Sequence, residues 1–444
     1  MKDVGARIRS FRKKTGWTQA QLAHQAGVSR ETVTRIERGR APDFYTLERV
    51  SMALGVTRNT LYPDGASDSL DELAALVQRE GFVSLTVLSK LADLADHAPH
   101  SEVRGEARVG LFVAALTGGD CARIRSVVSE NQRHRYDFGP HSQNVVNVQR
   151  QIFRFLRGNY QLSEVAKALR ERTGSLNLNR FTHDLLALKG GFLSWAELLH
   201  GNVRGAEHAL EALEATASSQ LDLSHWSDLY VFSFIEREQW SEAEALARLA
   251  LTTAAGPMYP LMLRANLGDA VAHLGILEGN LAKVREGLKF RTDAFVFLMN
   301  YQVGVAFPKA LVDLANVGSL VAARFSTTDP LPELDFCLHN LAAPWGDSAL
   351  KPSLHTQVDN LLRIAERWMV SSQQLGSLPD LYRVRGQQAQ LAGRKDEAEA
   401  CFLRAHREAK LVGNIILERR ASRCLREMRR LPVSFSFPSL TWRS

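Results

Sequence analysis

Hydrophobic residues recur at helical spacing, three or four positions apart, in nearly every segment of this chain. Two such apolar stripes lie within the first 62 residues, and they consist of Val4, Ile8 and Phe11, and of Leu47, Val50 and Leu54. From residue 70 onward the same spacing continues, with few alternating runs of β-branched residues. Since a period near 3.6 indicates an amphipathic helix and strict alternation indicates a strand, the pattern predicts an all-α protein.

Residues 18–39 carry the most specific local pattern. Thr18 followed by Gln21 is a capping box, in which each side chain accepts a hydrogen bond from the other residue's backbone and fixes a helix start. Gly27 is suited to end this helix because glycine readily adopts a positive φ. Ser29 can then cap a second helix. Two helices joined by so short a turn leave the second free to enter a DNA major groove.

This segment resembles the Cro/repressor-like (XRE-type) helix-turn-helix family of transcriptional regulators. The resemblance implies a five-helix head, in which Arg12 pairs with Glu37 to fix the orientation of the second helix. By position in the family motif, the residues that read base edges are Arg30, Glu31, Thr34 and Arg35. The positions that hold phosphates or neighbouring side chains are Gln19, Thr32, Arg38 and Arg40. The alternative is that Arg30 to Arg38 forms an ordinary solvated helix face.

The distribution of charge favours DNA as a partner of the amino end. Residues 1–62 hold twelve Lys/Arg and five Asp/Glu, and the formal net charge of the whole chain is +7. The other 382 residues are therefore neutral overall. A basic surface confined to one small segment is the electrostatic pattern of a nucleic-acid-binding head.

Beyond residue 70, residues that suit helix-ending turns recur at intervals close to forty. They are Gly119, Gly158, Gly201, Glu238, Gly279, Gly318 and Gly393, with a double interval before the last. A period near forty predicts stacked helical hairpins. The unit at 385–405 resembles a tetratricopeptide repeat, in which Gly386 and Ala398 let two helices touch while Phe402 and Ala405 contact the next hairpin. We therefore predict a tetratricopeptide-like solenoid.

A helix-turn-helix head joined to such a body resembles the peptide-responsive quorum-sensing regulators. The resemblance implies a body that dimerises and binds a signalling peptide. In repeats of this type, the residues thirteen, ten and six positions before the turn face the concave side. The candidate pocket residues obtained in this way are His225, Asp228, Asn266, Asp269, His273, Asp380, Arg383 and Gln387. They could hold an extended peptide, or they could be solvated residues that line an open superhelix.

Composition breaks divide the chain into four parts. We predict a DNA-binding head at 1–62, a linker at 63–69 rich in small and polar residues, a repeat body at 70–430 and a C-terminal tail at 431–444. Arginines at helical spacing near the end of the body could contact phosphates or form a solvated face. They are Arg419, Arg420, Arg423, Arg426, Arg429 and Arg430.

The partners and location follow from these features. One head makes few base contacts, so we expect a homodimer on double-stranded DNA, at a palindrome with half-sites roughly 34 Å apart or a multiple of it. Four scattered cysteines without a CxxC pair, and no signal peptide, favour the cytoplasm. No cofactor, metal or enzyme motif is recognisable, and no apolar run suits a membrane span. The alternatives to ligand sensing are a body that binds a protein partner, as in phage or defence modules, and an enzyme with a DNA-targeting head.

Overall fold

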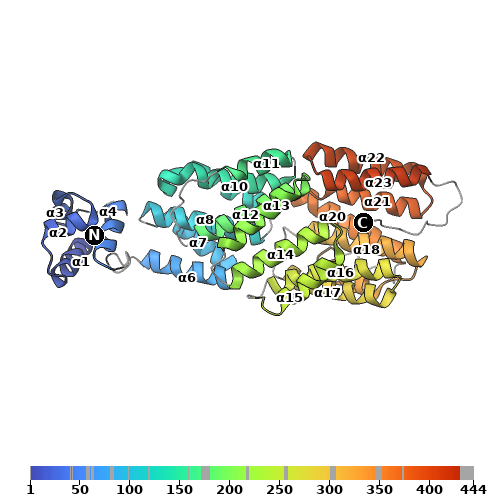
Figure 1. Ribbon diagram of the computed structural model, residues 1–444, viewed down its shortest axis with the longest axis horizontal. Helices are drawn as coiled ribbons and strands as arrows, with labels where there is room; N and C mark the ends of the chain where they lie inside the picture. Colours follow the sequence, from blue (N-terminus) through green and yellow to red (C-terminus); the bar gives the residue numbers. More distant parts are fainter. Residues whose placement is uncertain are drawn as a thin grey trace.

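The computed structural model describes most of the chain as helix. The described residues are 2–40, 42, 44–56, 61, 65–80, 85–98, 100–118, 121–158, 160–171, 181–216, 220–254, 259–300, 307–345, 353–372 and 375–430. Within these ranges every regular element is helical and no strand occurs, so the predicted all-α class is confirmed. Figure 1 shows a small head, formed by the described residues up to 61, at one end of a long helical body.

The head holds four helices in its described part. They are α1 (Lys2–Lys14), α2 (Gln19–Ala26), α3 (Arg30–Glu37) and α4 (Phe44–Ala53). The Thr18 hydroxyl accepts a hydrogen bond from the Gln21 backbone at 3.2 Å, and the Thr18 backbone donates to Gln21 Oε1 at 2.8 Å. Gly27 ends α2 with φ 63°. The predicted capping box and turn are thus confirmed. The expected fifth helix falls around Leu61, mostly outside the described residues.

A single apolar core closes the head. Leu22, Val33 and Val50 are fully buried in it, and Trp17 packs against it. α1 passes so close to α3 that a Cβ at Gly5 would clash with the carbonyl of Ile36. α3 is therefore fixed by packing on its inner side, which leaves its outer side free.

The segment between head and body is more helical than its composition suggested. α6 (Gly65–Glu80) begins at Gly65, so residues 65–69 of the predicted linker lie in a helix. From residue 66 to 80 the sequence has no Gly or Pro. The helix that buries Leu70 and Leu73 can therefore extend back through the small polar residues.

The body is a succession of antiparallel helices, with η1 as its one short 3₁₀ turn in the described part. The remaining helices are α7 (Leu85–His97), α8 (Ser101–Gly118), α9 (Cys121–Arg133), η1 (Arg135–His141), α10 (Ser142–Arg157), α11 (Leu162–Arg170), α12 (Thr182–Leu199), α13 (Val203–Thr216), α14 (Gln220–Glu236), α15 (Trp240–Leu251), α16 (Tyr259–Glu278), α17 (Leu281–Asn300), α18 (Phe307–Phe325), α19 (Pro332–Trp345), α20 (Leu354–Ser372), α21 (Leu378–Leu391), α22 (Lys395–Val412) and α23 (Ile415–Arg430). The predicted tail at 431–444 lies outside the described residues.

Most of the predicted turns are present. Positive φ angles end helices at Gly158, Gly201, Glu238, Gly279 and Gly393. Gly119 lies outside the described residues.

The prediction of a turn at Gly318 is wrong. Gly318 is buried in the middle of α18, where a Cβ would lie 2.7 Å from the Val358 side chain and 3.1 Å from that of Leu334. The turn falls at Ser326 instead, with φ 49°. Gly318 thus permits close packing of helices rather than a change of direction.

The tetratricopeptide-like unit consists of α21 and α22. A Cβ at Gly386 would lie within 2.5 Å of the Phe402 ring, so Gly386 lets the ring pack against α21. Ala398 and Phe402 share a buried cluster with Leu425 of α23. Phe402 therefore contacts both its own hairpin and the following helix.

The last three helices pack back against the first half of the body. The Leu375 backbone donates to the Arg157 carbonyl at 3.1 Å, and Gln161 Nε2 donates to the Leu411 carbonyl at 2.6 Å. Figure 1 shows α22 near α11, in agreement with the Gln161–Leu411 contact. The superhelix is consequently closed on itself at this point.

Candidate DNA interface and central pocket

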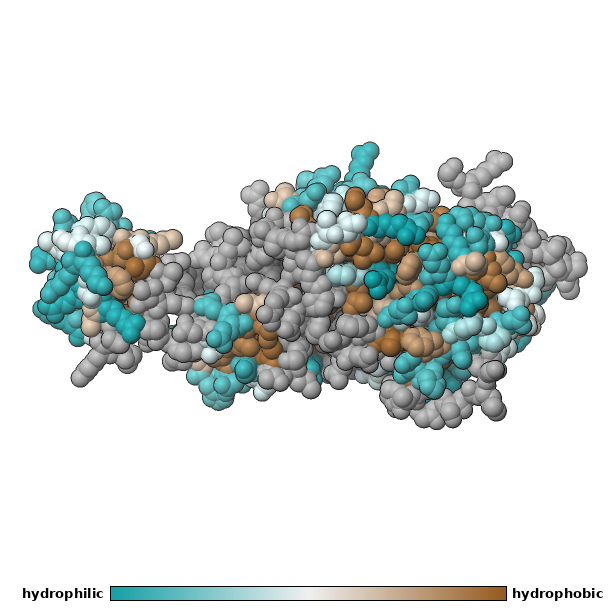
Figure 2. Space-filling model, turned by 90° about the horizontal axis from the view of Figure 1, so that it is seen from below, coloured by the Kyte–Doolittle hydropathy of each residue, from teal (hydrophilic) through white to brown (hydrophobic). Residues whose placement is uncertain are grey.

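α3 presents a polar outer face. The Ser29 hydroxyl caps α3 by accepting from the Thr32 backbone at 3.0 Å. Arg30, Glu31 and Arg35 are exposed, and Thr34 is half-buried. Figure 2 shows hydrophilic side chains over most of the visible face of the head. The outer face of α3 can reach base edges without rearrangement of the helix.

A buried ion pair fixes α3 against α1. Arg12 Nε donates to Glu37 Oε1 at 2.6 Å, and Arg12 Nη2 donates to Glu37 Oε2 at 2.9 Å. Arg12 Nη1 also donates to the Trp17 carbonyl at 2.6 Å. Burial raises the pKa of Glu37, but hydrogen bonds from Arg12 and Gln19 outweigh this effect and leave that pKa below its usual value. The hydrogen bond to Glu37 raises the pKa of Arg12. The pair therefore remains charged at neutral pH.

The residues predicted to contact the DNA backbone have two kinds of surroundings. Gln19 Nε2 donates to Glu37 Oε2 at 2.8 Å and Gln19 Oε1 accepts from the Thr34 hydroxyl at 3.2 Å, so Gln19 links α2 to α3. The hydroxyls of Thr32 and Ser29 are 2.8 Å apart. Arg38 and Arg40 are exposed just beyond α3. Only the two arginines extend into solvent.

The second site is a cavity inside the body, which we call the central pocket. Its volume is about 150 Å³, and α14, α15, α16, α18, α21 and α23 meet around it. It is lined by Ile235, Glu236, Glu238, Trp240, Asp269, His273, Ile276, Leu277, Lys309, Asp313, Asn316, Leu320, Asp380, Arg383, Gln387, Arg420, Arg423, Cys424 and Glu427.

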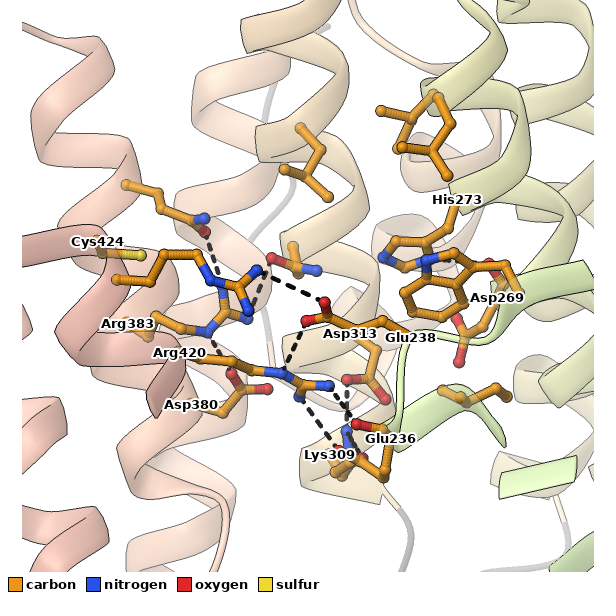
Figure 3. A pocket seen from close by; sticks show the side chains of 18 of the residues that line it. Glu236, Glu238, Asp269, His273, Lys309, Asp313, Asp380, Arg383, Arg420 and Cys424 are labelled. Atoms are coloured by element: carbon orange, nitrogen blue, oxygen red, sulfur yellow. Dashed lines mark hydrogen bonds and ion pairs between the residues drawn. The ribbon is translucent and has the colours of Figure 1, made fainter. Parts of the chain in front are cut away.

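Ion pairs from three helices meet on one side of the pocket. Lys309 Nζ lies 2.7 Å from Asp313 Oδ1 and 3.4 Å from Glu236 Oε1. Arg420 Nη1 lies 3.1 Å from Glu236 Oε2, and Arg420 Nε lies 3.3 Å from Glu238 Oε1. Figure 3 shows Arg420, Glu236 and Lys309 pointing toward one another. These contacts join α14, α18 and α23.

A second group of contacts joins α21 to α18. Arg383 Nε donates to Asp380 Oδ1 at 2.7 Å, and Arg383 Nη2 donates to Asn316 Oδ1 at 3.1 Å. Burial raises the pKa of Asp380, but the positive charges of Arg383, Lys309 and Arg420 outweigh it and lower that pKa to about 2. Asp380 is therefore ionised at neutral pH.

His273 is held neutral beside these charges. Its Nδ1 lies 2.8 Å from the Asp269 carbonyl oxygen, which can only accept, so Nδ1 carries the proton. The ring stacks on Trp240, with centroids 4.0 Å apart. Burial lowers the pKa of His273 to about 4.

Five of the eight candidate pocket residues line this cavity together. They are Asp269, His273, Asp380, Arg383 and Gln387. Asp269, Asp380 and Arg383 are buried, so they are not solvated residues of an open superhelix. The other three pair elsewhere: Asn266 Nδ2 donates to Asp228 Oδ1 at 2.8 Å, and His225 Nδ1 lies 2.7 Å from the Tyr259 hydroxyl.

The sequence reasoning missed the pocket residues on α18 and α23. The misplaced turn at Gly318 explains the first omission, because the positions thirteen, ten and six before the true turn at Ser326 are Asp313, Asn316 and Leu320, all of which line the pocket. On α23, Arg420 and Arg423 line the cavity and pair with acids there. Their acidic partners are far away in sequence, and no local pattern reveals them.

The head matches known proteins. A helix-turn-helix family model (HTH_3) matches residues 8–61. The immunity repressor protein of Bacillus phage phi105 is 48% identical over 54 residues, which are 12% of this chain and 38% of that repressor. The chain thus spans well under two thirds of the length of this relative.

A second relative is matched over most of its length. An uncharacterized helix-turn-helix transcriptional regulator of Methanothermobacter thermautotrophicus is 43% identical over 49 residues, which are 11% of this chain and 71% of that regulator. The chain belongs to the helix-turn-helix family of transcriptional regulators. In this helix-turn-helix protein, the residues that the family model matches, 8–61, lie in the head.

A larger part of the chain has a more distant likeness to a solved structure. The crystal structure of Bacillus thuringiensis PlcR in complex with the peptide PapR7 and DNA is similar over 69% of this chain and 99% of that chain, with a TM-score of 0.37 and 13% sequence identity.

Two further findings concern the described residues of this helix-turn-helix protein. Within these ranges, no three His, Cys, Asp or Glu side chains are grouped to hold a metal ion. None of the helices in the described part combines the length and apolar composition that a membrane span needs.

Proposed function

We propose that this chain is a sequence-specific DNA-binding transcription regulator of the cytoplasm. The observation that carries the proposal is the outer face of α3, where Arg30, Glu31 and Arg35 are exposed while the Arg12–Glu37 pair fixes the helix from behind. A rigid helix that follows a short turn and exposes two arginines suits the DNA major groove in width and charge. Family membership supports the same activity.

We assign two roles to the residues of the head. Arg30, Glu31, Thr34 and Arg35 read base edges, since arginine suits guanine and glutamate can accept from cytosine. The residues that position the backbone are Gln19, Thr32, Arg38 and Arg40. Because Gln19 bonds both Glu37 and Thr34, it also holds a base reader in place.

The body is proposed to dimerise, so that it places two heads on one operator. The family model covers only residues 8–61, and one head of this size contacts too few base pairs for useful selectivity. Two heads related by a two-fold axis require a palindrome with half-sites roughly 34 Å apart, or a multiple of it.

The body is also proposed to sense a peptide or another ligand through the central pocket. Support comes from its position where the last helix of the body packs on the middle of the body, so that a ligand there changes how α23 packs on α14. Such a change alters the spacing of the heads and hence the fit to the operator. The alternative is a body that binds a protein partner without a small ligand.

Selection of bound fragments from random DNA by the purified full chain tests the main proposal. We expect enrichment of a palindrome with two half-sites separated by one or more helical turns. Failure to enrich any sequence would refute sequence-specific binding, and enrichment of a lone half-site would refute the paired heads. Native mass spectrometry of the protein from its own host separates a bound ligand from a protein partner by the added mass.

A further inference from the structure

One buried oxygen in the central pocket lacks a partner. Asp269 is 5% exposed, and its Oδ2 pairs with Arg291 of α17. Its Oδ1 is buried and has no hydrogen-bond partner among the described residues, although Asp269 lines the cavity. An unsatisfied acceptor at such a place is unfavourable until a donor reaches it. A donor bound in the pocket beside Asp269 would satisfy this acceptor.

The charges around the pocket favour a cationic donor. The basic side chains that line it in the described part of the chain are Lys309, Arg383, Arg420 and Arg423. The acidic ones are Glu236, Glu238, Asp269, Asp313, Asp380 and Glu427. Arg291 does not line the pocket but adds one positive charge next to it, because it pairs with Asp269 and Asp313. Acids still exceed bases by one, which attracts a monovalent cation.

The size and the apolar wall limit what this cation can be. Ile276, Leu277 and Leu320 line the cavity near the stacked rings of Trp240 and His273. The volume of about 150 Å³ is smaller than the roughly 300–1,000 Å³ of sites for drug-sized ligands. The space suits a few non-hydrogen atoms with an apolar part, rather than a folded peptide.

We propose that the central pocket binds a small organic ammonium ion. Its N–H groups donate to Asp269 Oδ1, and its short alkyl chain lies against Leu320 and Ile276. The inference deepens the ligand-sensing part of the proposed function. Its test uses no DNA, so DNA binding and ammonium binding can fail separately.

The ionisation of Asp269 supports this assignment. Burial raises the pKa of Asp269 to about 7, although the charge of Arg291 lowers it. Of the groups on packed helices, Asp313 and Glu236 raise this pKa and Lys309 lowers it, whereas His273 on the same helix stays neutral. An alkylammonium ion, whose pKa is near that of lysine, roughly 10, stays charged and pairs best with the carboxylate form. Its affinity should therefore rise between pH 6 and pH 8.

Isothermal titration calorimetry of the full chain with butylammonium chloride tests the inference. Butanol and sodium butyrate serve as neutral and anionic analogues of the same length. We expect saturable binding of butylammonium at pH 8, weaker binding at pH 6, and no binding of either analogue. Equal binding of butanol, or no binding of butylammonium, would overturn the proposal.

Two variants locate the binding. Asp269→Asn keeps the size of the side chain and should weaken butylammonium binding by roughly 30-fold or more, because a buried charge pair is lost. The matched control Asp293→Asn changes an exposed acid on α17 and should bind as the unmodified chain does. Leu277 lines the pocket and is 40% exposed, so Leu277→Trp should block entry of butylammonium into the pocket without changing an ion pair. Unchanged binding by both Asp269→Asn and Leu277→Trp would exclude the central pocket.

Discussion

Arg420 donates to the Glu236 carboxylate and to the Glu236 backbone carbonyl oxygen, each at 3.1 Å, across 184 residues of sequence. The two residues lie on α23 and α14, so this contact joins the last helix of the body to its middle. Arg420 also reaches Glu238, which adopts a positive φ of 62° at the turn after α14. One side chain thus secures both a helix end and the turn that follows it.

Loss of this side chain should release α23. We expect Arg420→Gln to lower the free energy of unfolding by roughly 3–5 kcal/mol, because the acids it pairs with stay buried. Hydrogen exchange of α23 amides should accelerate more than that of α12. Arg419→Gln, which changes the exposed neighbour, is the control and should have little effect. Equal effects of the two variants would show that the contact with Glu236 is unimportant.

The buried Asp228 predicts a pH dependence of stability. Burial raises its pKa to about 7, despite the hydrogen bond from Asn266. A carboxyl with a raised folded-state pKa binds more protons when folded, so its contribution to stability is lost as the pH rises from about 4 to about 7. The free energy of unfolding of Asp228→Asn, relative to that of the unmodified chain, should therefore increase over this pH range by up to roughly 4 kcal/mol. Denaturant titrations at several pH values measure the difference, and a gap independent of pH would contradict the shifted pKa.

Gly318 and Gly393 should respond oppositely to the same substitutions. Gly393 has φ 74°, and a Cβ added there would meet nothing within 4 Å, so Gly393→Asn should cost less than Gly393→Ala, because asparagine tolerates positive φ better. At Gly318 the lack of space determines the cost. Gly318→Ala should lower the free energy of unfolding by about 1–3 kcal/mol through overpacking, and the larger Gly318→Asn should lower it further. Thermal unfolding of the four variants gives both orders. A lower cost of Asn than of Ala at Gly318 would contradict the role of this glycine in helix packing.

The head could be predicted from sequence because its signals are local. Thr18, Gln21 and Gly27 determine a helix start and a helix end by themselves, within ten residues. The Arg12–Glu37 pair came from the resemblance to a family, and the structure contains it. The half-buried bonds of Gln19 and Thr34 were not expected, since they depend on the angle between α2 and α3.

The helices of the body could be predicted only in part, because glycine either ends a helix or lets two helices pack closely there. Sequence spacing does not distinguish a glycine that turns the chain from one such as Gly318 that lets helices approach. The true turn at Ser326 lacks the usual residue type, so Asp313 and Asn316 were missed. Contacts such as Arg420 with Glu236 arise from the closure of the superhelix, which no local pattern encodes.

The measurement closest to the central claim compares Arg30→Ala with Arg38→Ala in binding to selected and random DNA over a range of salt concentrations. Both arginines are exposed, at the start of α3 and just beyond its end, so each variant serves as the control for the other. We expect Arg30→Ala to cost about 1–3 kcal/mol on the selected site and to relax one base position. Arg38→Ala should weaken all sequences alike and reduce the slope of log affinity against log salt by about one. Identical behaviour of the two variants on both kinds of DNA would contradict the assignment of α3 as the reading helix.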